Sequence, residues 1–501
     1  MKSDSIHYAG DYVLDSIKIV SFDGKPIDIK SMVQEFNIYE SIYSSTLTGS
    51  LVIADALNLI NKMPLQGTET LEFKLHTPGA GDTKQGVIDA TSETGHPFHI
   101  YKLSNRKQPS EGVLAYVLHF CSRELIRSVR TRVSQAYDGP LHESATKIFM
   151  DQDYLDSRKK LYVAPTRNKD KVVIPNLHPL DAINALANKS LSGNSKGAGY
   201  FFYETTKGFH FHSWESMVSI SGEQPRPVAG RFDYMVRKSQ SNNFKPDFTG
   251  RTMKPVEKFV QDLESVEKYE FINNYDSLAH QGLGTYGHKV ITHNIYDKSY
   301  SAYNWRYHNW YSQFKHADDT GHRDYDKYPI AKVPVDYDGE KTVSDFPDSM
   351  VTLQPTTQYL HGEQTGSFGI DIALDGLTHS VRNMQSNAMI NGIKVLLTIH
   401  GQSYLEAGDV IWFGLRSVEP EKAYPSTIDT KYGGRYVITK IRHRVTFDEY
   451  KMVLECVKDS VFTSHGSGDY VPKPSKQKGQ IINQYNLAEA ILGSQMGHHR
   501  K

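Results

Sequence analysis

The sequence predicts a mainly β protein with an α+β insert, made of two related small antiparallel β-barrel domains plus an α/β domain. Short segments of alternating apolar and polar residues, separated by Gly, Pro or Asn, give the β prediction. The return of these segments near the end of the chain gives the two related barrels. Helical spacing of apolar residues between the two sets gives the α/β domain.

Composition narrows the function classes. Lys plus Arg and Asp plus Glu each number 57, whereas a dedicated nucleic-acid binder normally has a basic excess. The 31 tyrosines suit β-structure and interfaces, because the ring buries apolar surface and the hydroxyl finds a polar partner. Only two cysteines, Cys121 and Cys456, are present, which argues against a disulfide scaffold and favours synthesis in a reducing cytoplasm. With no signal-peptide core and no stretch near 18 apolar residues, membrane insertion is not expected.

The strand-like segments of the first part recur in the same order in the last part. Four pairs match: 65–75 with 405–415, 98–106 with 436–444, 114–121 with 450–456 and, more weakly, 35–45 with 270–280. In the third pair Cys121 and Cys456 take the same place, and in the first pair Gly67 and Gly408 come just before the strand. One such pair arises easily by chance, but the shared order favours an internal duplication.

The region between the two sets has a different pattern. Helices are expected at residues 122–130, 140–150 and 179–192, the last with Pro179 at its start, and residues 199–214 predict a hairpin. Residues 222–260 and 315–387 have weak periodicity and are expected to be long surface excursions. The expected domains are 1–122 (first barrel), 123–215 (α/β insert), 216–300 plus 388–462 (second barrel), 301–387 (extended insertion) and 463–501 (linker and helix).

Two related barrels in one chain predict a ring. A barrel with open sheet edges can continue its sheet into a neighbour. Three chains with two barrels each would present six near-equivalent positions. Such a ring can match a threefold partner on one side to a sixfold partner on the other.

Several segments together resemble the baseplate central hub protein of contractile-tailed bacteriophages, and they are similar to the hub modules of related injection systems. The segments are YESIYSSTLTGSLVI (39–53), QGTETLEFKL (66–75), YFFYETTKGFHF (200–211) and the block from LEAGDVIWFGL (405–415) to YKMVLEC (450–456). The resemblance covers most of residues 10–300 and 388–460. It departs at 315–387 and 463–501, so the partner contacts of these segments are left open.

The resemblance implies a late structural protein of the virion, made in the host cytoplasm and placed in the tail baseplate. It implies a homotrimer whose tail-tube-like barrels form a pseudo-sixfold ring. The expected partners are the tail tube or a tube-initiator protein, the trimeric spike protein and neighbouring baseplate proteins, with DNA at most transient in the lumen. It implies no enzymatic activity, so no catalytic, cofactor or metal site is expected.

Two groups of residues are predicted to lie at interfaces. The first is an aromatic run, for which core packing and ligand stacking remain alternatives; its members are Tyr303, Trp305, Tyr307, Trp310 and Tyr311. The second is the apolar stripe of a short helix that follows a polar linker; its members are Ile481, Ile482, Tyr485 and Leu492.

Two other functions are weighed against the structural one. The aromatic run would suit a carbohydrate- or receptor-binding tail module. A cell-envelope-degrading enzyme is disfavoured, because no spacing of carboxylates singles out a general acid and its partner. A GxGxxG match at Gly282–Gly287 lies between a helix-like and a strand-like segment, which is the reverse of a dinucleotide site. The alternating His210 and His212 fit a half-buried strand better than a metal site.

Overall fold

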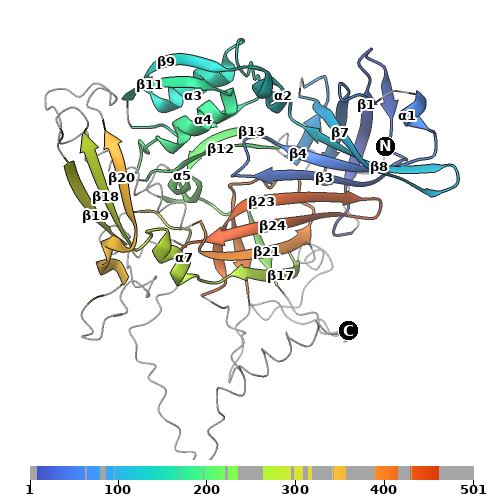
Figure 1. Cartoon of the computed structure of the whole chain (residues 1–501). Helices are drawn as coiled ribbons and strands as arrows, with labels where there is room; N and C mark the ends of the chain where they lie inside the picture. The colour runs from blue at the N-terminus through green and yellow to red at the C-terminus, as the bar shows by residue number, and fades with distance from the viewer. Residues whose placement is uncertain are drawn as a thin grey trace, which may run out of the picture. The chain divides into compact units, whose positions relative to one another are not determined.

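The computed structural model describes residues 8–62, 65–78, 86–94, 96–167, 169–195, 197–220, 224–234, 263–294, 298, 300–307, 314–318, 341, 343–356, 390–415, 429 and 431–461. In this part of the chain most elements are strands, and the largest sheet has 14 of them. The predicted fold class, mainly β with an α+β insert, is confirmed (Figure 1).

The first set of strands builds one half of the large sheet. Its strand order is β3-β4-β8-β7-β5-β1-β2, with β6 on β5, and neighbours are antiparallel. The elements are β1 (Val13–Val20), β2 (Pro26–Asp28), β3 (Val33–Ser41), β4 (Thr48–Asp55), α1 (Leu59–Lys62), β5 (Thr70–His76), β6 (Val87–Ala90), β7 (Phe98–Ser110) and β8 (Val113–Cys121). We call this set the first repeat.

The second set repeats this order. Its strands are ordered β17-β21-β24-β23-β22-β16, which matches β3-β4-β8-β7-β5-β1 strand for strand. One difference is that β16 is parallel to β22, whereas β1 is antiparallel to β5. The elements of this second repeat are β16 (Gly230–Asp233), β17 (Val266–Asn273), α7 (Ser277–Gly282), β21 (Ile393–His400), β22 (Val410–Gly414), β23 (Gly434–Thr446) and β24 (Tyr450–Lys458).

Two β-bulges fall at equivalent places in the two repeats. The ladder of β7 and β8 skips Tyr101, and the ladder of β23 and β24 skips Thr439. The ladder of β3 and β4 skips Gln34, and that of β17 and β21 skips Glu267. A bulge is a specific local feature of a strand pair, so its recurrence together with the strand order confirms the predicted duplication.

The bulges also correct two of the sequence matches. Ile100 pairs with Phe120 and Ile438 pairs with Cys456, so Cys456 takes the place of Phe120 and not of Cys121. The match of 35–45 with 270–280 is wrong by two residues, because Phe36 is equivalent to Tyr269. The match of 65–75 with 405–415 is in register: Leu71 and Ile411 occupy the same position in their ladders.

The two repeats share one sheet and one core. Strand β23 of the second repeat pairs antiparallel with β3 of the first, and Figure 1 shows them side by side. A single cluster of buried side chains runs through both repeats, from Ile17 and Phe73 to Leu397 and Leu454. The barrels are therefore joined through backbone hydrogen bonds as well as side-chain packing.

The α/β insert lies between the repeats in sequence and has its own core, in which Ile148, Ile183 and Phe209 are completely buried. The predicted helices and hairpin are confirmed, and β10 runs parallel to β13 beside the hairpin. The elements are α2 (Arg123–Arg130), β9 (Val133–Pro140), α3 (Leu141–Met150), β10 (Leu161–Val163), β11 (Lys169–Leu177), α4 (Pro179–Asn188), β12 (Tyr200–Thr205), β13 (Gly208–Ser213) and α5 (Trp214–Val218). Two short strands, β14 (Ser219–Ile220) and β15 (Gln224–Pro225), follow.

A separate small sheet has the order β19-β18-β20. Its strands are β18 (Gly287–Asn294), β19 (Tyr300–Arg306) and β20 (Val351–Thr356), preceded by the short 3-10 turns η5 (Val343–Asp345) and η6 (Pro347–Ser349). The expected boundaries place β18 with the second barrel, but it pairs with β19 and, in parallel, with β20. The parallel partner comes from a distant segment, which no local sequence pattern reveals.

The expectation that residues 315–387 form a surface excursion is wrong for their start. Asp318 is completely buried and accepts hydrogen bonds from Lys458 Nζ at 3.1 Å and Arg435 N at 2.7 Å. His316 Nδ1 lies 2.8 Å from Asp459 Oδ2. These contacts fix the segment on the end of β24.

Candidate functional site

The candidate site is the junction between the two repeats, where β23 pairs with β3. Seven residues of each strand are in register, from Lys440 opposite Ser41 to Thr446 opposite Glu35. The two strands alternate between an inner face on the shared core and an outer face. Ile38, Glu40, Ile441 and His443 are buried on the inner face.

The outer face of the junction holds an arginine and carboxylate cluster. Arg442 donates to Asn37 Oδ1 at 2.9 Å and to Glu35 Oε1 at 3.0 Å, and Arg444 donates to Glu35 Oε2 at 3.0 Å. Partial burial alone would raise the pKa of Glu35. Hydrogen bonds from Asn37 and Arg444, together with the charges of the two guanidinium groups, outweigh burial and lower the pKa. All three charged side chains remain partly exposed, so we expect each pair to contribute less than about 1 kcal/mol.

The inner face holds a buried carboxylate that links three regions of the chain. Glu40, on β3, accepts from Thr206 N of the β12–β13 hairpin at 3.0 Å and from Ala407 N of the second repeat at 2.9 Å. His443 Nε2 of β23 lies 3.4 Å from the same carboxylate, and its Nδ1 lies 2.7 Å from Tyr450 Oη. A buried carboxylate is costly unless hydrogen-bonded, so removing Glu40 would leave backbone donors of two other regions without their acceptor.

The tip of the β12–β13 hairpin is fixed to the second repeat by Glu406. Its carboxylate accepts from Thr205 Oγ1 at 2.8 Å and lies 3.4 Å from His210 Nε2 and 3.5 Å from Lys207 Nζ. Burial opposes ionisation, but the hydrogen bond and charge of His210 and the charge of Lys207 lower the pKa of Glu406 to about 2. His210 is stacked between two rings, Tyr162 at 4.8 Å and Tyr203 at 5.0 Å between centroids.

The same end of the hairpin is fixed to the first repeat by Glu204, the residue before Thr205 on β12. Its Oε2 accepts from Leu47 N at 2.8 Å, and its Oε1 accepts from Lys159 Nζ, which also donates to Glu124 at 3.0 Å. Burial alone would lower the pKa of Lys159, but the two carboxylates raise it. The α/β insert therefore closes the junction from one side through buried, satisfied polar groups.

The equivalent edges at the opposite ends of the repeats are open in the described part of the chain. Strand β17 is the counterpart of β3 and pairs with β21 only. Residues 102–110 of β7, which we call its outer half, pair with β8 only, whereas the equivalent residues of β23 also pair with β3. Asn37 is 2% exposed, whereas the side chain of its counterpart Glu270 is 63% exposed. Lys102, Arg106 and Lys107 are exposed along β7.

Sequence reasoning missed this junction. The basic residues of its outer face lie within the matched segment 436–444, but nothing in the sequence pairs that segment with 35–41. A usable signal is present at Glu40 and Glu204, which stand at inward positions of strands whose other inward residues are apolar. Such carboxylates need donors from elsewhere in the fold.

The predicted interface residues are partly described. Trp305 on β19 and Tyr307 just after it are buried within the chain, which is compatible with core packing, one of the open alternatives, and leaves their predicted interface role untested. The side chains of Tyr303, Trp310 and Tyr311 lie outside the described residues, and so does the stripe Ile481, Ile482, Tyr485 and Leu492. Their interface role stays a prediction.

The motifs weighed for chemistry have structural roles in the described residues. The glycine-rich turn follows α7 and precedes β18, which is the predicted reversed order. Among the described residues, no three His, Cys, Asp or Glu side chains form a metal-binding group. Within the same part of the chain, no helix has the length and apolar character needed to cross a bilayer.

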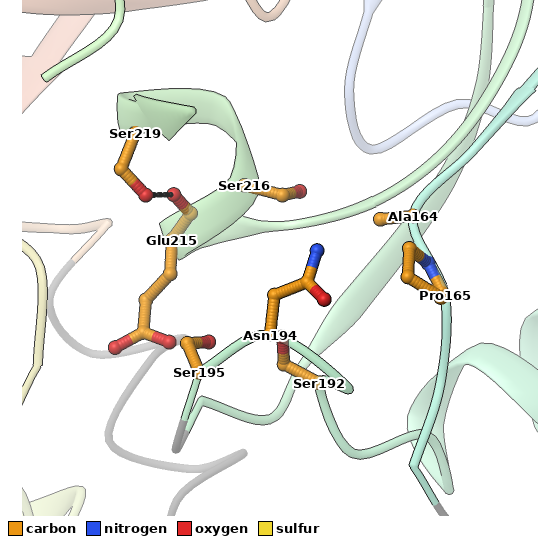
Figure 2. A pocket seen from close by; sticks show the side chains of 8 residues that line it. All are labelled: Ala164, Pro165, Ser192, Asn194, Ser195, Glu215, Ser216 and Ser219. Carbon is orange, nitrogen blue, oxygen red and sulfur yellow. Dashed lines mark hydrogen bonds between the residues drawn. The ribbon is translucent and has the colours of Figure 1, made fainter. Parts of the chain in front are cut away.

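A small pocket lies in the α/β insert, with about 260 Å³ of empty volume that includes open solvent (Figure 2). Hydroxyl groups dominate its lining, which consists of Ala164, Pro165, Ser192, Asn194, Ser195, Glu215, Ser216 and Ser219. The carboxylate of Glu215 accepts from Gly197 N at 2.9 Å and Lys315 N at 3.1 Å. Burial raises its pKa. Glu215 thus holds two loops together.

Comparison with known proteins gives structural likenesses. No protein-family model matches the sequence, and no curated protein matches it. The chain is similar to a tail protein from Neisseria meningitidis MC58, with 10% identity, a TM-score of 0.48 and coverage of 90% of this chain and 98% of that one. A 43 kDa tail protein of prophage MuSo2 from Shewanella oneidensis gives 8% identity, a TM-score of 0.46 and coverage of 90% and 100%.

An E. coli component of the type VI secretion system, described as structurally similar to T4 tail proteins gp27 and gp5, gives 8% identity and a TM-score of 0.38. It is matched over 87% of this chain and 76% of its own length. Likeness at these identities and TM-scores decides nothing about function. The strand pairing of this chain carries the proposal that follows.

Proposed function

We propose that this chain is a structural hub subunit of a phage tail baseplate, without catalytic turnover, which forms a trimeric pseudo-sixfold ring that joins the tail tube to the central spike. The observation that carries the proposal is the pairing of β23 with β3 inside one chain. This pairing joins two repeats of the same strand order side by side in one sheet.

The same operation, applied between chains, continues the sheet. In the part of the chain that the structure describes there is one completed junction, and two strands that could form another have an unpaired edge: β17 and the outer half of β7. An edge strand with free backbone donors and acceptors is a template for pairing with another chain. Head-to-tail contacts of this kind close into a ring when the rotation per subunit allows it.

A ring of three such chains has threefold symmetry in its sequence and near-sixfold symmetry in its strands. Among the described residues the α/β insert and the β18–β20 sheet each occur once, so a trimer would present three copies of each. A threefold spike would contact these once-per-chain regions, and a sixfold tube would contact the six repeats. The count of three is what the resemblance of the sequence segments to phage hub proteins implies, and a mass measurement tests it.

Native mass spectrometry or light scattering of the purified full chain tests the proposal. We expect a species of three times the 56.7 kDa chain mass, and ring-shaped particles by negative-stain microscopy. A chain that stays monomeric at all concentrations, alone and with tail tube and spike proteins of its own particle, would contradict it.

A further inference from the structure

We propose that β17 of one copy adds antiparallel to the outer half of β7 of the next copy, with Glu270 opposite Lys107. This interface presupposes the proposed ring. Its strands, register and facing residues are specified below. It is obtained by carrying the β23–β3 ladder of the single chain over to the equivalent strands.

The register follows from the strand ladders. Asn37 pairs with Ser50, and Glu270 pairs with Leu396; Ser50 and Leu396 are equivalent because the bulges at Gln34 and Glu267 coincide. Glu270 is therefore the counterpart of Asn37.

The other strand is assigned in the same way. Arg444 pairs with Lys451 and Lys107 pairs with Ala115, and these partners are equivalent positions of β24 and β8. Lys107 is the counterpart of Arg444. Because Arg444 lies opposite Asn37 in the completed junction, Lys107 would lie opposite Glu270.

The charges of the two open edges suit this register. The outer half of β7 carries Lys102, Arg106 and Lys107 and has no acidic residue, just as the equivalent half of β23 carries Lys440, Arg442 and Arg444. Strand β17 supplies one carboxylate at this register, Glu270 at the position of Asn37. The counterpart of Glu35 is Lys268, which lies 3.5 Å from Glu270. Opposite charges at facing positions of neighbouring strands stabilise the pair, and like charges destabilise it.

Exposed apolar side chains lie next to both edges. Tyr101 is 46% exposed at the bulge where its counterpart Thr439 is fully buried by the completed junction. Beside β17, Ile272, Tyr275 and Leu278 are 52%, 72% and 79% exposed. In the completed junction the residue after β3, Ile42, donates its N–H to Thr439 O and is buried. The segment after β17 would cover Tyr101 of the next copy in the same way.

One feature of the completed junction has no counterpart at the open one. The β12–β13 hairpin closes the β23–β3 junction through Glu40 and Glu406, and no second hairpin of this kind occurs among the described residues. The junction between copies would depend more on its exposed charges, which salt screens. We expect the ring to separate into chains at high ionic strength while each chain keeps its two repeats together.

A disulfide between copies tests the register. The full chain carrying Lys107→Cys and Glu270→Cys is oxidised under mild conditions and run on a non-reducing denaturing gel. Facing residues of antiparallel strands lie about 4.5–5.5 Å apart between Cα atoms, which suits a disulfide. Both native cysteines are buried, so they do not compete. We expect covalently linked trimers that reducing agent separates.

The matched control carries Ser104→Cys and Glu270→Cys, which moves one thiol three residues along β7 and should give no linked trimer. Equal linking of both pairs would overturn the register. A native trimer that links through neither pair would overturn the interface and leave the proposed ring intact. Absence of any trimer from the unsubstituted chain would instead overturn the proposed function.

Discussion

The two repeats have the same strand order but differ in what covers their edges. In the first repeat, β3 lies between β4 and β23, and its residues Asn37 and Glu40 are buried. In the second repeat, the equivalent strand β17 has one neighbour among the described strands, and Lys268 and Glu270 on it are exposed. The polar residues of the two strands therefore differ with the environment of the strand. On the covered strand β3 they are buried and hydrogen-bonded to distant parts of the chain, and on the open strand β17 they are exposed charges.

The largest expected effect comes from removing the carboxylate that closes the completed junction. Glu40→Ala leaves Thr206 N and Ala407 N without their acceptor, and we expect a loss of about 2–4 kcal/mol in the free energy of unfolding. Denaturant titration followed by tryptophan fluorescence and circular dichroism measures it. A loss below about 1 kcal/mol would mean that the hairpin and the two repeats are held together elsewhere.

The next effect sharpens the contrast at the open edge. Glu270→Lys should weaken trimer formation about tenfold or more, because it places like charges opposite each other between copies. Within the chain it breaks only the exposed Lys268–Glu270 pair, so the free energy of unfolding of the single chain should change by less than about 0.5 kcal/mol. Mass photometry over a dilution series measures the trimer fraction. Combining Glu270→Lys with Lys107→Glu should restore most of it, whereas the combination failing as badly as the single change would speak against a facing pair.

A pH effect is expected where the second repeat meets the hairpin. Burial and the neighbouring Glu406 carboxylate raise the pKa of Asp409 from 3.8 to about 6, so ionising it costs stability as pH rises through that window. Asp409→Asn removes this cost. We expect a gain of about 1–2 kcal/mol at pH 7 and almost none at pH 2.5, where the aspartate is protonated in both the folded and the unfolded state. Equal effects at both pH values would show that the charge is not the cause.

The smallest effect concerns the outer face of the completed junction. Glu35→Ala removes the partner of Arg442 and Arg444, but these groups are partly exposed, so we expect less than about 1 kcal/mol. Unfolding at low and high salt checks this, since the effect should shrink as salt screens the pair. It also serves as the control for Glu40→Ala on the same strand.

The proposed aromatic interface illustrates how far sequence patterns reach. The run from Tyr303 to Tyr311 has the composition of an interface, and the same composition also suits a small core. Trp305 and Tyr307 are buried and contact the rings of Phe314 and Tyr286. The strand that carries Trp305 pairs with β18, whose other neighbour, β20, comes from about 50 residues further on. Local composition carries no information about such a distant partner.

The sequence by itself determined the strand and helix types, the hairpin at 199–214, and the duplication, because alternation, turn residues and order are local or repeated signals. It determined the register less well: the placement of Cys121 against Cys456 and of Phe36 against Phe271 failed, because bulges add residues that a simple alignment cannot place. Only the tertiary structure decided that β23 pairs with β3 and that Glu40 serves three regions. The β23–β3 pairs join residues about 400 positions apart, and Glu40 bonds to residues 166 and 367 positions away. The stability of these contacts depends on donors and packing that exist only once the chain has folded.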